Sequence, residues 1–178
     1  AYSHFVLANM FCMPYNPATA GNCLGIPYMD HAETDLNPRY ERGTLQEVYE
    51  MIGKDIEAGI PLIDDTAYSV PKYHFNYKAA CCFASRYYLF MQDWDNAIKY
   101  ATMALTSNPS SLLRDYSAIA ALPNGTSRHQ EYVNSASTAN FLLQAATSNS
   151  GLLFDWYSTA GRYSHGKLQG IYETVQPK

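Results

Sequence analysis

Apolar residues recur at helical spacing between residues 44 and 60, and charged residues occupy the opposite side. This pattern is typical of an amphipathic helix that buries one face. Thr44 and Glu47 have the spacing of a capping box, in which each side chain bonds the other residue's free backbone N–H. We therefore predict a helix that starts at Thr44 and ends before Pro61. Its apolar stripe consists of Leu45, Val48, Tyr49, Ile52, Ile56 and Ile60.

Three further helices are predicted from apolar runs, over residues 1–12, 77–90 and 94–105. The last two are joined by the short connector MQDW, which favours an antiparallel helical hairpin. Residues 14–43 are rich in Pro, Asn and Gly and lack an apolar period, so we expect a long ordered loop there.

The hairpin matches a repeat pattern. Tyr88, Ala97, Ala104 and Pro109 lie at the separations of the 34-residue tetratricopeptide repeat, with small residues where its two helices touch. Such units bury a core only by stacking on neighbours, so the two earlier helices are expected to belong to adjacent, degenerate pairs. The predicted fold class is all-α (mainly α), built from tetratricopeptide-like helix pairs with long ordered loops.

The composition changes after Ser107, where Ser, Asn, Gly, Thr and Tyr dominate. We expect loops there, with one short helix and at most one short strand. Residues 1–109 are therefore interpreted as the helical scaffold portion, and residues 110–178 as a loop-rich variable segment of the same domain.

Charge and hydropathy exclude several classes of protein. The 178 residues include 12 Lys and Arg and 16 Asp and Glu, and 47% of them are apolar, which fits neither a disordered tail nor a polyanion-binding protein. We expect no nucleic-acid partner. The longest apolar runs are too short or too interrupted to form a helix across a bilayer.

Four cysteines, at positions 12, 23, 81 and 82, leave the redox compartment undecided. Cys81 and Cys82 are adjacent in a predicted helix and point in different directions, so they are poorly placed to pair. Cys12 and Cys23 flank a loop and are either bridged or free, and we favour free, partly buried thiols. The first residues show no signal peptide, and we expect both ends to be cuts within a longer protein. The missing neighbouring helices predict exposed apolar faces on residues 1–12 or 44–60, and hence self-association.

Two motifs resemble functional sites but lack a decisive residue. Residues 161–168, GRYSHGKL, follow the phosphate-loop pattern GxxxxGK, yet Leu168 replaces the Ser or Thr that binds magnesium. His31 and Glu33 form the HxE of zinc deaminases without the cysteine pair that completes the metal site. We predict no metal and no cofactor.

The carboxylate pairs Asp64–Asp65 and Asp93–Asp95 are the candidates for acid–base chemistry. Both pairs lie beside predicted turns, where Asp commonly caps the local backbone. We therefore assign no catalytic residue and predict that the chain is not an enzyme.

Aromatic residues in loops are the remaining candidate site. Trp156 and Tyr157 follow Asp155, with Arg162 and Tyr163 close behind, in a segment rich in Gly and Ser. Exposed rings suit stacking on sugar rings, while Asp and Arg suit hydroxyl groups. Alternatively, Trp156 pins the loop to the helices.

A second cluster of this kind, Tyr15 with Asn16, follows the first predicted helix.

Several blocks of the sequence resemble the SusD/RagB family, the nutrient-binding outer-membrane lipoproteins of Bacteroidetes. They are AYSHFVLANMFCMPY at the start, LGIPY at 24–28, RGTLQEVYEMIGKDIEAGIPLI at 42–63 and NYKAACCFASRYYLFMQDWDNAIKYATMAL at 76–105. The resemblance covers residues 1–109 and is only loose beyond them. It implies a SusD-like α-α superhelix displayed at the cell surface of the outer membrane, through a lipid anchor that this chain does not contain.

The resemblance also implies a function. Family members bind an oligosaccharide, or in some cases a peptide, and lie as a lid on a SusC-like TonB-dependent transporter. By position, the sugar-stacking aromatics of the family correspond to Tyr15 with Asn16 and to Trp156 with Tyr157. We thus expect a glycan-binding protein, with three alternatives: an oligopeptide-binding member of the family, a tetratricopeptide-type adaptor, or a glycan-cleaving enzyme.

Overall fold

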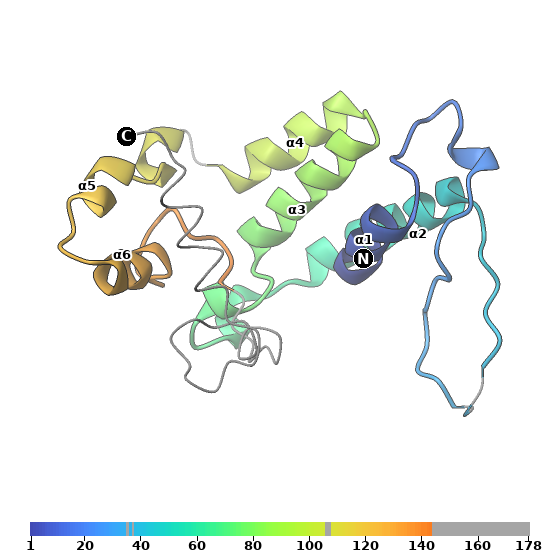
Figure 1. The fold of residues 1–178 in the computed structure, drawn as a ribbon, viewed down its shortest axis with the longest axis horizontal. Coiled ribbons are helices and arrows are strands. Elements are labelled where there is room, and N and C mark those ends of the chain that lie inside the picture. Colours follow the sequence, from blue (N-terminus) through green and yellow to red (C-terminus); the bar gives the residue numbers. More distant parts are fainter. Residues whose placement is uncertain (35, 37, 106–107, 144–178) are drawn as a thin grey trace, which may run out of the picture. The chain divides into compact units, whose positions relative to one another are not determined.

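The computed structural model describes residues 1–34, 36, 38–105 and 108–143, and this part of the chain is mainly helical, as predicted. Residues Ala1–Leu143 form one compact unit, and residues 144–178 lie outside the described part. No strand occurs in the described part. Its α-helices are α1 (Tyr2–Phe11), α2 (Leu45–Gly59), α3 (Tyr77–Phe90), α4 (Trp94–Ala104), α5 (Tyr116–Ala120) and α6 (Gly125–Tyr132) (Figure 1).

The α2 helix confirms the capping-box prediction. Thr44 accepts a hydrogen bond from the Glu47 N–H at 3.1 Å, and the Glu47 carboxylate accepts one from the Thr44 N–H at 2.7 Å. The residues of the predicted apolar stripe are all buried. The helix ends at Gly59 and continues as a 3-10 turn over Ile60–Leu62, because Pro61 offers no N–H to a further α-helical turn.

The α3 and α4 helices form the predicted hairpin, lying side by side in Figure 1. Asn76 and Asp93 cap their N-termini, accepting hydrogen bonds from the N–H groups of residues 79 and 96. The connecting turn places Gln92 in the left-handed region at φ 62°. Ala97 and Tyr88 are buried between the helices, as the repeat pattern predicts.

An aromatic cluster forms the core where α1, α2 and α3 meet. Phe5 of α1 packs edge-on against Tyr49 of α2 and Tyr87 of α3, with ring centroids 6.1 and 6.4 Å apart. Tyr49 and Tyr87 stack on each other at 5.9 Å. Each ring is at most 5% exposed, so these three helices share one hydrophobic core.

The predicted exposed apolar face occurs on α1 but not on α2. Leu7, Met10 and Phe11 project from α1 and are 43–69% exposed. The apolar stripe of α2 is covered instead by α1, α3 and the loop between α1 and α2. This loop closes on itself through an isolated antiparallel bridge between Leu24 and Thr44.

Gly25 allows the loop to close at that bridge. Its N–H donates to the Gly43 carbonyl at 2.8 Å, and a Cβ at Gly25 would lie 2.6 Å from a Val48 methyl and 2.7 Å from the Thr44 carbonyl oxygen. Beyond the bridge, residues 25–43 run outward and return, a segment that we call the excursion (Figure 1).

Residues 109–143 correct one prediction, because they contain two short α-helices, α5 and α6, instead of one. Asp115 and Asn124 cap these helices, each accepting a 2.9 Å hydrogen bond from a backbone N–H three residues on. These side chains stabilise helix starts that apolar spacing alone does not reveal.

All four cysteines are free, which confirms that prediction. Cys81 is buried and the other three are partly exposed. Among the described residues, no helix has the length and hydrophobicity required to cross a membrane.

Candidate functional site

The predicted site residues fall in two parts of the chain. Tyr15 and Asn16 are described by the structure. The remaining five, Asp155, Trp156, Tyr157, Arg162 and Tyr163, lie outside the described residues.

Tyr15 lies just after α1 with its ring packed against Tyr49. The two ring centroids are 4.4 Å apart and the rings are inclined by 33°. Tyr15 is partly exposed, whereas Tyr49 is buried. Burial, together with the negative charge of Glu50, raises the pKa of the Tyr15 phenol, so the hydroxyl stays protonated at neutral pH. The ring thus supports the loop and still presents part of its surface to solvent.

Asn16 is exposed and shapes the turn that follows. Its side-chain oxygen accepts a 2.9 Å hydrogen bond from the Ala18 N–H. Its carbonyl oxygen accepts hydrogen bonds from the N–H groups of Thr19 and Ala20 at 3.0 and 2.8 Å. These bonds lead into a 3-10 turn over Ala20–Asn22, whose first residue is buried. Asn16 therefore holds the loop in the conformation that carries Tyr15.

A cleft of about 490 Å³ opens between α1 and the excursion. Phe11 and Tyr40 contribute exposed rings to it, and Arg42 contributes a guanidinium whose Nε donates to the Gly25 carbonyl at 2.6 Å. Leu7, Ile26, Pro27 and Met29 complete its mainly apolar lining.

A smaller cleft of about 250 Å³ has a more polar lining, but several of its polar groups hold the backbone. Lys72 Nζ donates to the Ser137 carbonyl at 2.6 Å, and Asn76 Nδ2 donates to the Phe141 carbonyl at 2.6 Å. The buried Asn140 side chain likewise bonds the carbonyls of Tyr132 and Asn134. The hydrogen bonds beside this cleft therefore hold residues 71–76 against residues 137–143.

Of the four aspartates that were not assigned as catalytic, Asp64 and Asp93 have the local capping role that was expected. Asp64 accepts from the Thr66 N–H at 2.9 Å, and Asp93 accepts from the Asn96 N–H at 3.1 Å. Asp65 accepts from the Tyr77 N–H at 2.8 Å, which ties it to the start of α3. Within the described ranges, no three His, Cys, Asp or Glu side chains are grouped so that they could hold a metal ion.

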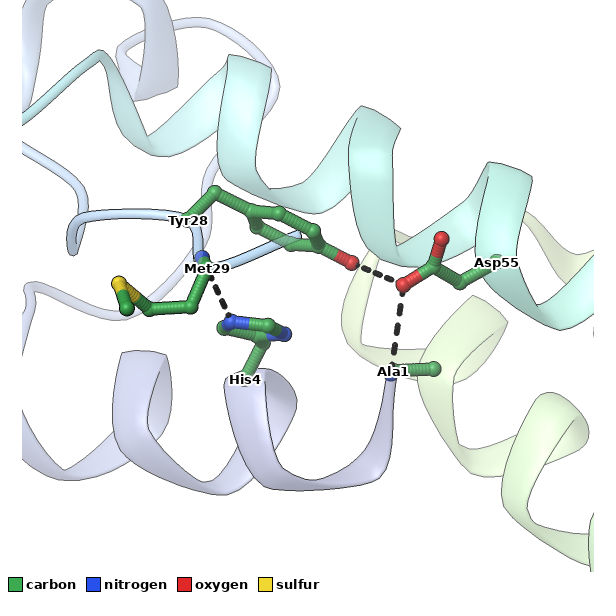
Figure 2. A network of polar contacts seen from close by, with 5 residues as sticks. All are labelled: Ala1, His4, Tyr28, Met29 and Asp55. Carbon is green, nitrogen blue, oxygen red and sulfur yellow. Dashed lines mark hydrogen bonds and ion pairs between the residues drawn. The ribbon is translucent and has the colours of Figure 1, made fainter. Parts of the chain in front are cut away.

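One polar network was missed by sequence reasoning. His4 on α1 accepts a hydrogen bond from the Met29 N–H, while Asp55 on α2 accepts one from the Tyr28 hydroxyl (Figure 2). The partners are 25 and 27 residues apart, so no local spacing could reveal them. The network joins α1, the excursion and α2.

Comparison with known proteins identifies a family model that matches part of this chain. Residues 1–89 match the family model SusD-like_3, described as starch-binding associating with outer membrane. The matched stretch contains α1, the excursion, α2 and all of α3 except its last residue, and includes both Tyr15 and Asn16. A search of curated proteins found no match.

Proposed function

This chain belongs to the SusD-like family, whose description is starch binding in association with the outer membrane, and from this membership we propose that it captures an oligosaccharide at the cell surface without cleaving it. The observation that carries the proposal is the family match over residues 1–89. We further propose that the captured glycan passes to a SusC-like TonB-dependent transporter on which this protein lies.

The described residues support capture because they combine a helical frame with a fixed aromatic loop. Tyr15 is held on Tyr49 at a centroid distance of 4.4 Å, and Asn16 orders the turn beside it. A ring that is already held in place loses little conformational entropy when a ligand binds, which favours affinity. We propose that the exposed part of this ring contacts the sugar.

We assign the main stacking contact to the aromatic residues of the predicted loop at 155–163. In this proposal Trp156 and Tyr157 stack on sugar rings, while Asp155, Arg162 and Tyr163 form hydrogen bonds with hydroxyl groups. Flat rings provide apolar contact to the C–H faces of a sugar, and charged or hydroxyl groups provide orientation.

The chain has two tryptophans, Trp94 and Trp156, and this allows a direct test. The Trp94→Phe variant leaves Trp156 as the only indole, and the Trp156→Phe variant leaves Trp94, which is 59% exposed at the start of α4. Each variant is titrated with a panel of oligosaccharides and with a tryptophan-free peptide pool while indole emission is recorded. We expect an oligosaccharide to change the emission of Trp94→Phe and to leave that of Trp156→Phe unaltered.

Calorimetry of the intact chain and of a Trp156→Ala, Tyr157→Ala variant completes the test. If the heat of oligosaccharide binding is measured for the intact chain and is absent in the variant, the result supports stacking by these rings. Binding to peptides alone assigns the protein to the peptide-binding alternative, and cleavage of a labelled oligosaccharide contradicts the non-catalytic proposal.

A further inference from the structure

A single histidine joins α1 to the excursion. His4 Nε2 accepts a 3.0 Å hydrogen bond from the backbone N–H of Met29, and the His4 ring stacks on Tyr28 with centroids 3.9 Å apart and an interplanar angle of 17° (Figure 2). Met29 lies on the outgoing arm of the excursion, residues 27–34. The contact therefore holds this arm against α1.

The contact fixes the protonation state of His4. A nitrogen that accepts a hydrogen bond carries no proton, so the neutral ring must carry its proton on Nδ1. Nδ1 is buried, and no hydrogen-bond partner for it exists among the described residues. An imidazolium would point an N–H at the Met29 N–H and would gain no acceptor at Nδ1. The closed arrangement is thus compatible only with neutral His4.

The charged and titratable groups around the ring come from three elements. Asp55 on α2 attracts a proton to His4, but its Oδ2 already accepts the Tyr28 hydroxyl at 2.5 Å and lies 3.4 Å from the Ala1 nitrogen. Burial is the largest influence, and the combined effect lowers the pKa of His4.

We propose that His4 is a pH-sensitive latch, in which protonation of the ring releases Met29 and frees the outgoing arm from α1. The base of the excursion stays closed, because no titrating group takes part in its hydrogen bonds. The Gly25 N–H donates to the Gly43 carbonyl, and the Leu45 N–H donates to the Cys23 carbonyl. The released arm carries Met29 away from Leu7 and Phe11, so the cleft beside α1 changes shape.

The sign of the pH dependence follows from this arrangement. When the arm is open, His4 titrates near its ordinary value of about 6.5. When the arm is closed, the proton binds less readily, so the closed state has its full stability above pH 6.5 and loses it as the pH falls. If the closed ring stays neutral, the open fraction rises up to about eightfold between pH 7 and 5.5.

The test is amide hydrogen exchange of Met29, measured by NMR on the full chain between pH 7.5 and 5 and expressed as a protection factor. We expect protection to fall up to about eightfold from pH 7 to 5.5. In His4→Gln, whose amide oxygen can accept from Met29 without titrating, protection should not change with pH. His74→Gln is the matched control, because His74 stacks on Tyr68 away from the excursion, and it should keep the native profile.

Either of two results overturns the latch. One is Met29 protection that is independent of pH in the native chain, or equally dependent in His4→Gln. The other is a ¹⁵N titration of the His4 ring in the native chain whose midpoint lies at or above about 6.5, because a closed arm that excludes the proton must lower that midpoint. The second measurement needs no variant, so it decides the matter even if His4→Gln does not fold.

Discussion

The hydroxyl of Tyr87 on α3 donates a 2.6 Å hydrogen bond to the carbonyl oxygen of Tyr49 on α2, at the point where α2 carries Gly53. A Cβ at Gly53 would lie 2.6 Å from the Tyr87 hydroxyl oxygen and 3.3 Å from the ring carbon that bears it. The missing side chain thus lets the tyrosine reach the backbone of the neighbouring helix. Gly53 is needed for this close approach between α2 and α3.

Gly53→Ala should destabilise the protein by about 1–3 kcal/mol, the usual cost of overpacking a core. Alanine favours a helix over glycine by about 1 kcal/mol, but here the methyl group would displace a buried ring that Phe5, Tyr49 and Tyr88 surround. The measurement is the free energy of unfolding from urea denaturation, monitored by far-UV circular dichroism.

Gly59→Ala is the matched control, because the same helix offers open space there, with no atom within 4 Å of the added carbon. This change should be neutral or stabilising by up to about 1 kcal/mol. Combining Gly53→Ala with Tyr87→Phe should cost less than the sum of the single changes, since removing the hydroxyl relieves the contact. Strict additivity would show that the two residues do not interact as described.

These contacts join residues that are distant in the sequence, so local sequence patterns do not predict them. The capping box at Thr44 and the apolar stripe predicted α2 closely, because both signals lie within one turn of the residues they affect. The same stripe predicted that Tyr49 faces inward, but not that it stacks on Tyr87, 38 residues later. Nothing in the sequence distinguishes Gly53 from another glycine within a helix, because its contact with Tyr87 depends on how α2 and α3 pack.

The candidate site was less predictable than the helices. Tyr15 could be identified as a loop aromatic, but its support by Tyr49 depends on how α1 and α2 pack. His4 gave no signal at all, since its partner is a backbone N–H, which any residue at position 29 except proline would offer. Pairs that a folded chain brings together over long sequence distances require the structure.

Asn76 should be one of the most sensitive polar positions. It is 5% exposed, caps α3 through the Ala79 N–H, and donates to the carbonyls of Pro71 and Phe141. Asn76→Ala loses the cap, worth about 1 kcal/mol, and leaves the partly buried Phe141 carbonyl without this donor, at a further cost of about 1 kcal/mol. Urea denaturation measures the total.

Asn76→Asp separates these two roles, because aspartate keeps the cap but cannot donate while ionised. We expect it to be destabilising too, and to raise hydrogen exchange at Leu143, whose N–H donates to the Lys72 carbonyl at 2.7 Å. Asn124→Asp, at the exposed cap of α6, is the control and should be nearly neutral. Equal effects of the two substitutions would contradict a special role for the Asn76 amide.

The capping box of α2 should make stability depend on pH in the acid range. Hydrogen bonds from the Thr44 N–H and hydroxyl lower the pKa of Glu47 below its ordinary value of 4.5. This contribution is fully present above the unfolded-state pKa and is lost as the pH falls through the lower, folded value. In Thr44→Ala, the pKa of Glu47 should rise toward 4.5 as the hydroxyl bond disappears, and the helix cap should weaken by about 1 kcal/mol at neutral pH.

An NMR titration of the Glu47 side chain measures this shift. An unchanged Glu47 midpoint in Thr44→Ala would mean that the Thr44 hydroxyl contributes little to the capping box.

Tyr15→Phe should separate ligand contact from loop support. The phenylalanine ring keeps its packing on Tyr49, so the free energy of unfolding should change by no more than about 0.5 kcal/mol. If the hydroxyl bonds a sugar hydroxyl, as the proposed function suggests, oligosaccharide affinity should fall roughly two- to tenfold, the effect of one neutral hydrogen bond. Tyr49→Phe is the control, because it removes a hydroxyl from the buried ring of the same pair. The Tyr49 hydroxyl lies 3.4 Å from Asn9 Oδ1, so this change should leave oligosaccharide affinity unchanged. Calorimetry with the oligosaccharide identified in the panel measures both variants. Full affinity in Tyr15→Phe together with reduced stability in Tyr15→Ala would assign Tyr15 to supporting the loop and leave ligand contact to other residues.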